Sequence, residues 1–127
     1  MTARRWIAVG LTAQAVIVAT WWLTLLARPD LAAHFLPAGW PTAALFAFWP
    51  ADLLLLVAGS VAGAIGIARR ARWAPAMAWA LAGAALYATL FCLGALLSTG
   101  SGVLAVAAML PCAIGSCACA AAAGRVR

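Results

Sequence analysis

Four long apolar runs, each close to the length that crosses a lipid bilayer, constrain this chain more than any other feature of its sequence. They cover about residues 6–27, 50–68, 74–97 and 103–123. A transmembrane helix needs about 20 apolar residues, because each residue adds about 1.5 Å along the axis and the hydrocarbon layer is about 30 Å thick. The sequence therefore predicts an all-α integral membrane protein, a single four-helix bundle over residues 1–127.

The composition excludes an ordinary soluble domain. Hydrophobic residues make up 69% of the chain and charged residues 8%, against roughly 25% charged residues in a typical soluble domain. A net charge of +6 could indicate nucleic-acid binding. The arginines, however, lie at the ends of apolar runs and form no basic face or arm. We therefore expect the lipid bilayer as a partner, and no nucleic acid.

The placement of the arginines predicts the orientation in the membrane. Arg28 falls on one side of the four-span arrangement, and the other seven fall on the opposite side: Arg4, Arg5, Arg69, Arg70, Arg72, Arg125 and Arg127. The positive-inside rule then puts both termini in the cytoplasm. Trp6 and Trp73 would mark the inner boundary, and Trp40 and Trp49 the outer one. The alanine-rich, lysine-free composition suggests a bacterial inner membrane.

The start of the second span has two interpretations. Residues 28–49 are rich in proline and aromatic residues, which prevents one continuous helix there. The second helix begins either at Pro50, or near Pro41 with a kink at Pro50, since proline suits the first turn of a helix. We expect the start at Pro50, because Trp49 would then lie in the interfacial aromatic belt.

Glycines follow one side of the second span. At about 100° per residue, Asp52, Gly59, Gly63 and Gly66 fall within a stripe roughly 60° wide. Gly59 and Gly63 form a G-x-x-x-G step, which lets another helix approach closely. We therefore expect the three glycines to pack against a helix, and Asp52 to face protein instead of lipid. In the first span, Gln14 is expected to hydrogen-bond to another helix.

Polar residues gather at the predicted outer end of the bundle, and they are Arg28, Asp30, His34 and Asp52. Asp52 could be structural, as the third residue of a helix whose dipole favours an anion and with Arg28 as its counter-ion. It could instead be functional, because an acid inside a membrane helix is costly and often marks a site. His34 is an ordinary polar loop residue in one interpretation and a proton or ligand site in the other.

No catalytic or metal-binding motif stands out. The four cysteines all lie within predicted spans without a C-x-x-C pair, so we interpret them as small packing residues: Cys92, Cys112, Cys117 and Cys119. Asp30 and Asp52 are the only acidic residues, which gives little basis for a paired-carboxylate mechanism. The sequence predicts no catalytic residue, no cofactor and no metal.

Part of the chain resembles known membrane protein families. The small multidrug-resistance transporters share the length and the four spans, but they rely on a membrane-embedded Glu where this first helix offers Gln14. Residues 35–95 more closely resemble the DoxX-like four-helix bacterial membrane proteins. The resemblance rests on the outer loop Phe35–Pro41, on Asp52 with glycines beneath it, and on Arg69 and Arg70. It implies an inner-membrane subunit that partners a redox or other enzyme system.

These features favour a non-enzymatic accessory or self-associating subunit, in a homo-oligomer or with another membrane protein. One alternative is a small transporter or channel in which Asp52, Arg28 and Gln14 line the path. Another is an intramembrane partner for quinone or lipid chemistry, with His34, Asp52 and Tyr87 as its polar groups.

Overall fold

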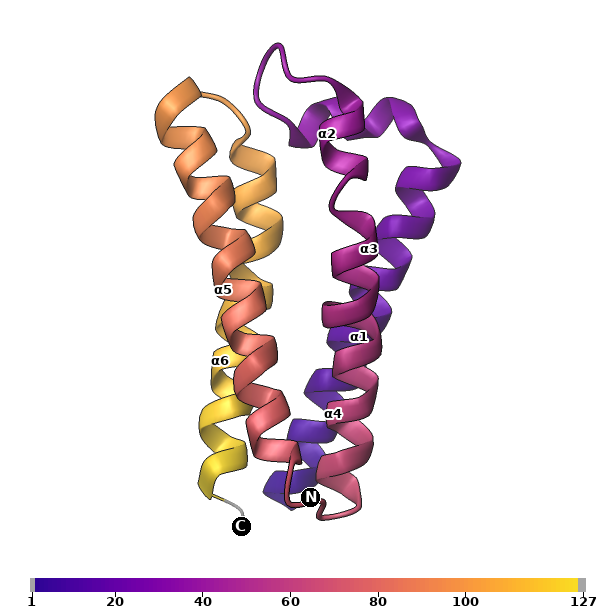
Figure 1. Ribbon diagram of the computed structural model, residues 1–127, viewed down its shortest axis with the longest axis vertical. Coiled ribbons are helices and arrows are strands. Elements are labelled where there is room, and N and C mark those ends of the chain that lie inside the picture. The colour runs from indigo at the N-terminus through magenta and orange to yellow at the C-terminus, as the bar shows by residue number, and fades with distance from the viewer. Residues whose placement is uncertain (1, 126–127) are drawn as a thin grey trace.

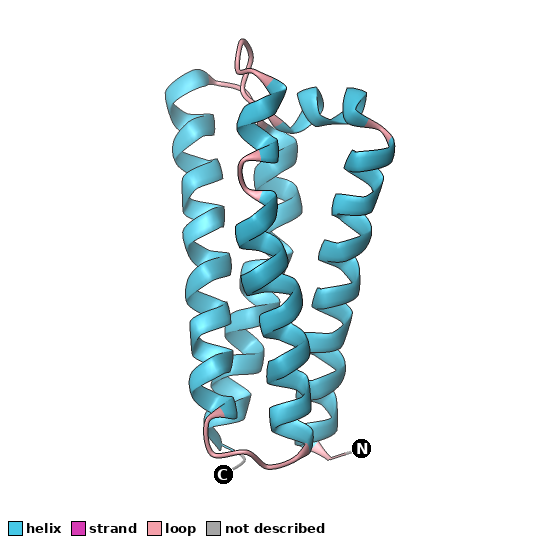
Figure 2. Ribbon diagram, turned by 45° about the vertical axis from the view of Figure 1, so that its right-hand side comes forward, coloured by secondary structure: helices cyan, strands magenta, loops and turns pink. Residues whose placement is uncertain are grey.

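The chain folds as an all-helical bundle. The computed structural model describes residues 2–125, and no strand occurs among them (Figure 2). Four helical segments are long and apolar enough to cross a membrane: α1 (Ala3–Ala27), the second span Thr42–Ala68, α5 (Ala74–Thr99) and α6 (Val103–Arg125). This confirms the predicted all-α class with its four candidate spans.

The second span is irregular. It begins near Pro41, which was the less favoured of the two starts predicted from the sequence. It consists of α2 (Thr42–Phe46), α3 (Trp49–Ala51), a π-helical segment η2 (Asp52–Ala58) and α4 (Gly59–Ala68). Proline has no N–H, and its ring crowds the carbonyl group four residues earlier. The helix is accordingly interrupted at residues 47–48 and resumes at Trp49, one residue before Pro50.

This start changes the surroundings that the helix-cap interpretation assumed for Asp52. Asp52 lies inside the span that begins at Thr42, in the first turn after the helix resumes at Trp49. Its N–H group already donates a helical hydrogen bond to the Phe48 carbonyl oxygen at 3.0 Å. Asp52 therefore lies one turn after the interruption, and its own N–H group is not an unpaired donor at a helix start.

The two ends of the bundle differ in composition. The start of α1, the end of α6 and the turn between α4 and α5 lie at the same end of the bundle (Figure 1). We call it the arginine end, because it carries six of the seven described arginines: Arg4, Arg5, Arg69, Arg70, Arg72 and Arg125. Arg127 lies outside the described residues. The opposite end, the loop end, holds Arg28, the helical turn η1 (Pro29–Phe35), the connection 36–41 and the turn 100–102.

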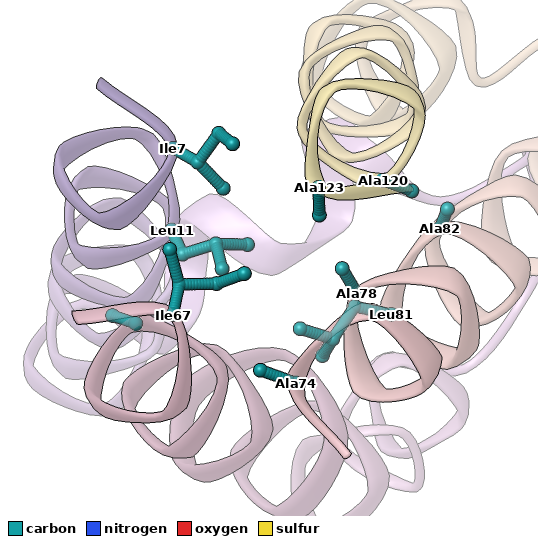
Figure 3. Close-up of a cluster of buried hydrophobic side chains, with 10 residues drawn as sticks. Ile7, Leu11, Ile67, Ala74, Ala78, Leu81, Ala82, Ala120 and Ala123 are labelled. Atoms are coloured by element: carbon teal, nitrogen blue, oxygen red, sulfur yellow. The ribbon is translucent and has the colours of Figure 1, made fainter. Parts of the chain in front are cut away.

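The helices pack most closely toward the arginine end. A cluster of ten buried residues there draws on all four spans (Figure 3). Six are alanines, and Leu11 and Leu81 fill the space between them. Small residues let helix backbones approach closely in a membrane, where dispersion contacts between helices replace the hydrophobic effect.

The glycines of the second span belong to this packing. An added Cβ would lie 2.9 Å from Leu81 Cδ2 at Gly59, 3.2 Å from Leu11 Cδ1 at Gly63, and 2.7 Å from a Trp73 ring carbon at Gly66. The glycine face therefore contacts α1, α5 and the turn before α5 within one chain. Because these contacts lie within one chain, the glycines of the second span no longer argue for self-association by themselves.

Gln14 joins three helices in a buried polar network. Its Nε2 donates to Ser60 Oγ in α4 at 3.1 Å, and Ser116 Oγ in α6 donates to its Oε1 at 2.7 Å. Ser60 and Ser116 are fully buried. The expected interhelical hydrogen bond of Gln14 is confirmed, and the network fixes the relative rotation of α1, α4 and α6.

We expect Gln14→Leu to lower the free energy of unfolding by about 1 kcal/mol, because interhelical hydrogen bonds in membranes average about 0.6 kcal/mol and two are lost. The loss is modest because both serine hydroxyls can turn to a carbonyl group of their own helix, as Thr12 does with Ala8. Unfolding in mixed detergent micelles measures the change, with Thr12→Val as the control. A Gln14→Leu protein as stable as the unmodified one would contradict the structural role of the network.

Candidate functional site

A cavity of about 610 Å³ extends from the middle of the bundle to the loop end. All four spans line it, and α5 and α6 diverge there from α1 and the second span (Figure 1). Alanine and glycine let the helices meet at the arginine end, whereas aromatic side chains are numerous in the wall of the cavity. The polar or weakly polar side chains in its wall are Gln14, Asp52, Tyr87, Cys92, Cys112 and Cys119.

Asp52 is the one carboxyl group in the cavity wall. Trp22 Nε1 in α1 donates a hydrogen bond to Asp52 Oδ2 at 3.1 Å, and Trp22 is only 3% exposed. No described residue donates to the other oxygen, Oδ1. Since no fully buried polar side-chain atom in residues 2–125 lacks a partner, Oδ1 must retain accessible surface. Asp52 thus offers an acceptor to whatever occupies the cavity.

Aromatic side chains form much of the wall around this carboxyl group. Trp21 and Phe35 meet edge-to-face with ring centroids 4.2 Å apart. Phe91 lies 5.3 Å from Phe48 and 6.4 Å from Trp40 by the same measure. All five rings line the cavity. Their faces carry negative electrostatic potential, so the site suits an apolar molecule or an organic cation.

The connection 36–41 closes the cavity at the loop end. The Ala38 N–H group donates to Ser101 Oγ at 2.8 Å, which ties this connection to the turn between α5 and α6. Gly102 has a φ of 92° there, and its Cβ position lies 3.6 Å from the Pro37 nitrogen. Leu36, Pro37 and Trp40 consequently line the cavity from this end.

The cavity is open at its sides. Ile17 of α1, Leu55 of η2 and Tyr87 of α5 all line it and are also exposed, Tyr87 by 72%. These residues belong to spans whose outer surface is apolar. A molecule dissolved among lipid acyl chains therefore has a more direct route into the cavity than one in water.

The four polar residues expected to cluster are not brought together. Arg28 pairs with Asp30 at 2.8 Å, and both side chains are more than half exposed. The predicted contact between Arg28 and Asp52 is wrong, because Arg28 turns outward from the end of α1 to its near neighbour. The hydrogen bonds from Arg28 hold the pKa of Asp30 below its ordinary value. His34 is exposed in η1 and does not line the cavity.

The sequence reasoning missed Trp22 and the aromatic wall. Trp22 could have been identified, because an acid inside a membrane span needs a hydrogen-bond donor from a neighbouring helix. The Trp22 indole N–H is such a donor at a comparable depth in the first span. The four cysteines are unpaired and partly buried. Among residues 2–125, no group of three His, Cys, Asp or Glu side chains is placed to hold a metal ion.

Comparison of the chain with protein-family models, with curated proteins and with solved structures finds no match. The functional argument therefore rests on the cavity itself.

Proposed function

We propose that this chain is a small multi-pass membrane protein that binds a lipophilic organic cation in its cavity, with Asp52 as the anionic anchor. The observation that carries the proposal is a single carboxyl group, with one oxygen still available, in an otherwise apolar and aromatic wall. The volume of about 610 Å³ lies within the range of roughly 300–1,000 Å³ that is typical of small-molecule sites.

The physical argument is that a bound cation would compensate the charge of the Asp52 carboxylate. A carboxylate inside a membrane helix is costly when it is unpaired, and such groups usually face a partner or a functional cavity. One indole N–H satisfies only part of its hydrogen-bonding capacity. A bound cation would neutralise the charge, while the faces of Trp21, Phe48 and Phe91 would stabilise it further through cation–π contacts.

The proposal narrows the functions expected from the sequence. A transport path that includes Arg28 loses support, because Arg28 pairs with Asp30 outside the cavity. Binding is a step that a small transporter of lipophilic solutes and a ligand-carrying accessory subunit would share. We also propose the accessory role that the DoxX-like resemblance implies. The proposed location is a bacterial inner membrane, with the arginine end in the cytoplasm.

Two ions of nearly the same shape and opposite charge test the proposal. We expect tetraphenylphosphonium to bind at least about tenfold more tightly than tetraphenylborate, which corresponds to about 1.4 kcal/mol. Quenching of tryptophan fluorescence in lipid nanodiscs measures both affinities, because Trp21, Trp22 and Trp40 line the cavity. Equal binding of the two ions, or no saturable binding of the cation, would overturn the proposal.

A further inference from the structure

A second groove, of about 580 Å³, lies at the arginine end of the bundle. The first turn of α1 forms one side of it and the end of the second span forms the other, and its charged side chains are Arg4, Arg5 and Arg70. The two acidic residues of the sequence, Asp30 and Asp52, lie outside this groove. The described side chains around the groove are thus cationic or uncharged.

The backbone adds to this positive potential. Helix α1 has 25 residues and begins with Thr2 as its N-cap, whose hydroxyl makes no capping hydrogen bond. The helix dipole makes the N-terminal end of a helix favourable for anions. Thr2 and Ala3 line the groove, so the N-terminus of α1 and the arginine side chains face the same space.

Arg70 occupies a backbone conformation that normally calls for glycine. Its φ is 58°, the one positive φ outside glycine among residues 2–125. It ends α4 in a Schellman motif, in which Ala71 N–H donates to the Gly66 carbonyl at 2.8 Å and Arg70 N–H to that of Ile67 at 3.2 Å. The left-handed conformation is unfavourable for residues with a Cβ atom. Residues held in strained conformations are candidates for a functional role, and this arginine borders the groove.

We propose that this groove binds the phosphate of an anionic phospholipid headgroup. Guanidinium groups match phosphate oxygens with paired hydrogen bonds, and arginines beside the end of a membrane span favour anionic lipids. The position of the groove favours a lipid over phosphate free in solution. Trp6 and Trp73 are both exposed near the ends of α1 and α5 at this end, and tryptophan concentrates at headgroup depth.

Lipid titration of the full chain, followed by native mass spectrometry, tests the site. Phosphatidylglycerol is expected to bind more tightly than phosphatidylcholine. Arg70→Gly should weaken phosphatidylglycerol binding about fivefold, because one arginine near the membrane surface contributes about 1 kcal/mol. The same substitution should leave the thermal unfolding midpoint unchanged or raise it, because glycine suits the left-handed conformation. A purely structural role of Arg70 would lower that midpoint without changing lipid selectivity.

Two further variants and one competitor complete the test. Arg5→Gln removes a charge inside the groove and should weaken phosphatidylglycerol binding. Arg72→Gln removes a charge from the same turn as Arg70 but outside the groove, so it should leave this binding unchanged. If Arg72→Gln weakens binding as much as Arg70→Gly and Arg5→Gln do, the effect is diffuse charge and the site is refuted. Displacement of the lipid by an equal concentration of inorganic phosphate would overturn the assignment to a headgroup. Equal affinity for the two lipids would overturn the proposal altogether.

Discussion

Gly63→Leu is expected to lower the free energy of unfolding by about 3 kcal/mol, at the upper end of the usual range for overpacked positions. Gly63 is buried in α4, and its Cβ position lies 3.2 Å from Leu11 Cδ1 and 3.4 Å from Leu81 Cδ1. Those two leucines come from α1 and α5 and are almost fully buried. Four added carbon atoms have no space there, so α4 must move away from both neighbours.

Gly83→Leu is the matched control for this experiment. It is the same substitution in the middle of α5, but nothing lies within 4 Å of the added Cβ. We expect its stability to stay close to that of the unmodified chain. Unfolding in mixed micelles, followed by circular dichroism, measures both variants. If Gly63→Leu unfolded normally but changed the oligomeric state, the glycine face would lie between chains, contrary to the packing described here.

Asp52→Asn should reduce the affinity for tetraphenylphosphonium about a hundredfold. Removing one partner of a buried charge pair typically costs about 3–5 kcal/mol, and the open sides of this cavity place the loss near the lower bound. Asparagine keeps the shape of the side chain, and its oxygen can still accept the hydrogen bond from Trp22. The substitution therefore removes the charge while it preserves the helix contact.

Asp30→Asn makes the same chemical change at the other acidic residue, which is exposed and paired with Arg28. It should leave cation binding unchanged in the same fluorescence titration. Cation affinity that survived in Asp52→Asn would show that the aromatic wall binds without the carboxyl group. In that case Asp52 would serve only to hold Trp22 and α1 in place.

The sequence was sufficient for the features that depend on hydropathy and on small residues. Runs of about twenty apolar residues predicted the four spans because few alternatives can satisfy the backbone of such a segment. Gln14 was identifiable because an amide in a membrane helix needs a partner on another helix. Its two partners, Ser60 and Ser116, were not identifiable, since they depend on the rotation of α4 and α6.

The sequence singled out Asp52, Gln14 and Tyr87, which line the cavity, but the arrangement around them could not be predicted, for a physical reason. The expected stripe of Asp52 and three glycines assumed regular α-helical geometry from residue 52 to residue 66. The π-helical turns of η2 are wider than α-helical turns, so the face that carries Asp52 is rotated relative to that of the glycines. Asp52 meets Trp22 in α1, Gly59 meets Leu81 in α5, and Gly63 lies between Leu11 in α1 and Leu81 in α5. Opposite charge alone does not determine which residues pair. Arg28 donates hydrogen bonds to Asp30, two residues away, and not to Asp52.

The alanine-rich packing at the arginine end has a consequence for how the bundle can move. Alanine has no side-chain rotamers to lose when it is ordered, so this half holds its arrangement at little entropic cost. Amide hydrogens of α4 and α6 in this half should accordingly be among the slowest to exchange with solvent. The aromatic half is joined across its far end by the hydrogen bond from Ala38 to Ser101. Breaking this hydrogen bond would let ligand entry spread the helices of the aromatic half, while the packing at the arginine end keeps them in register.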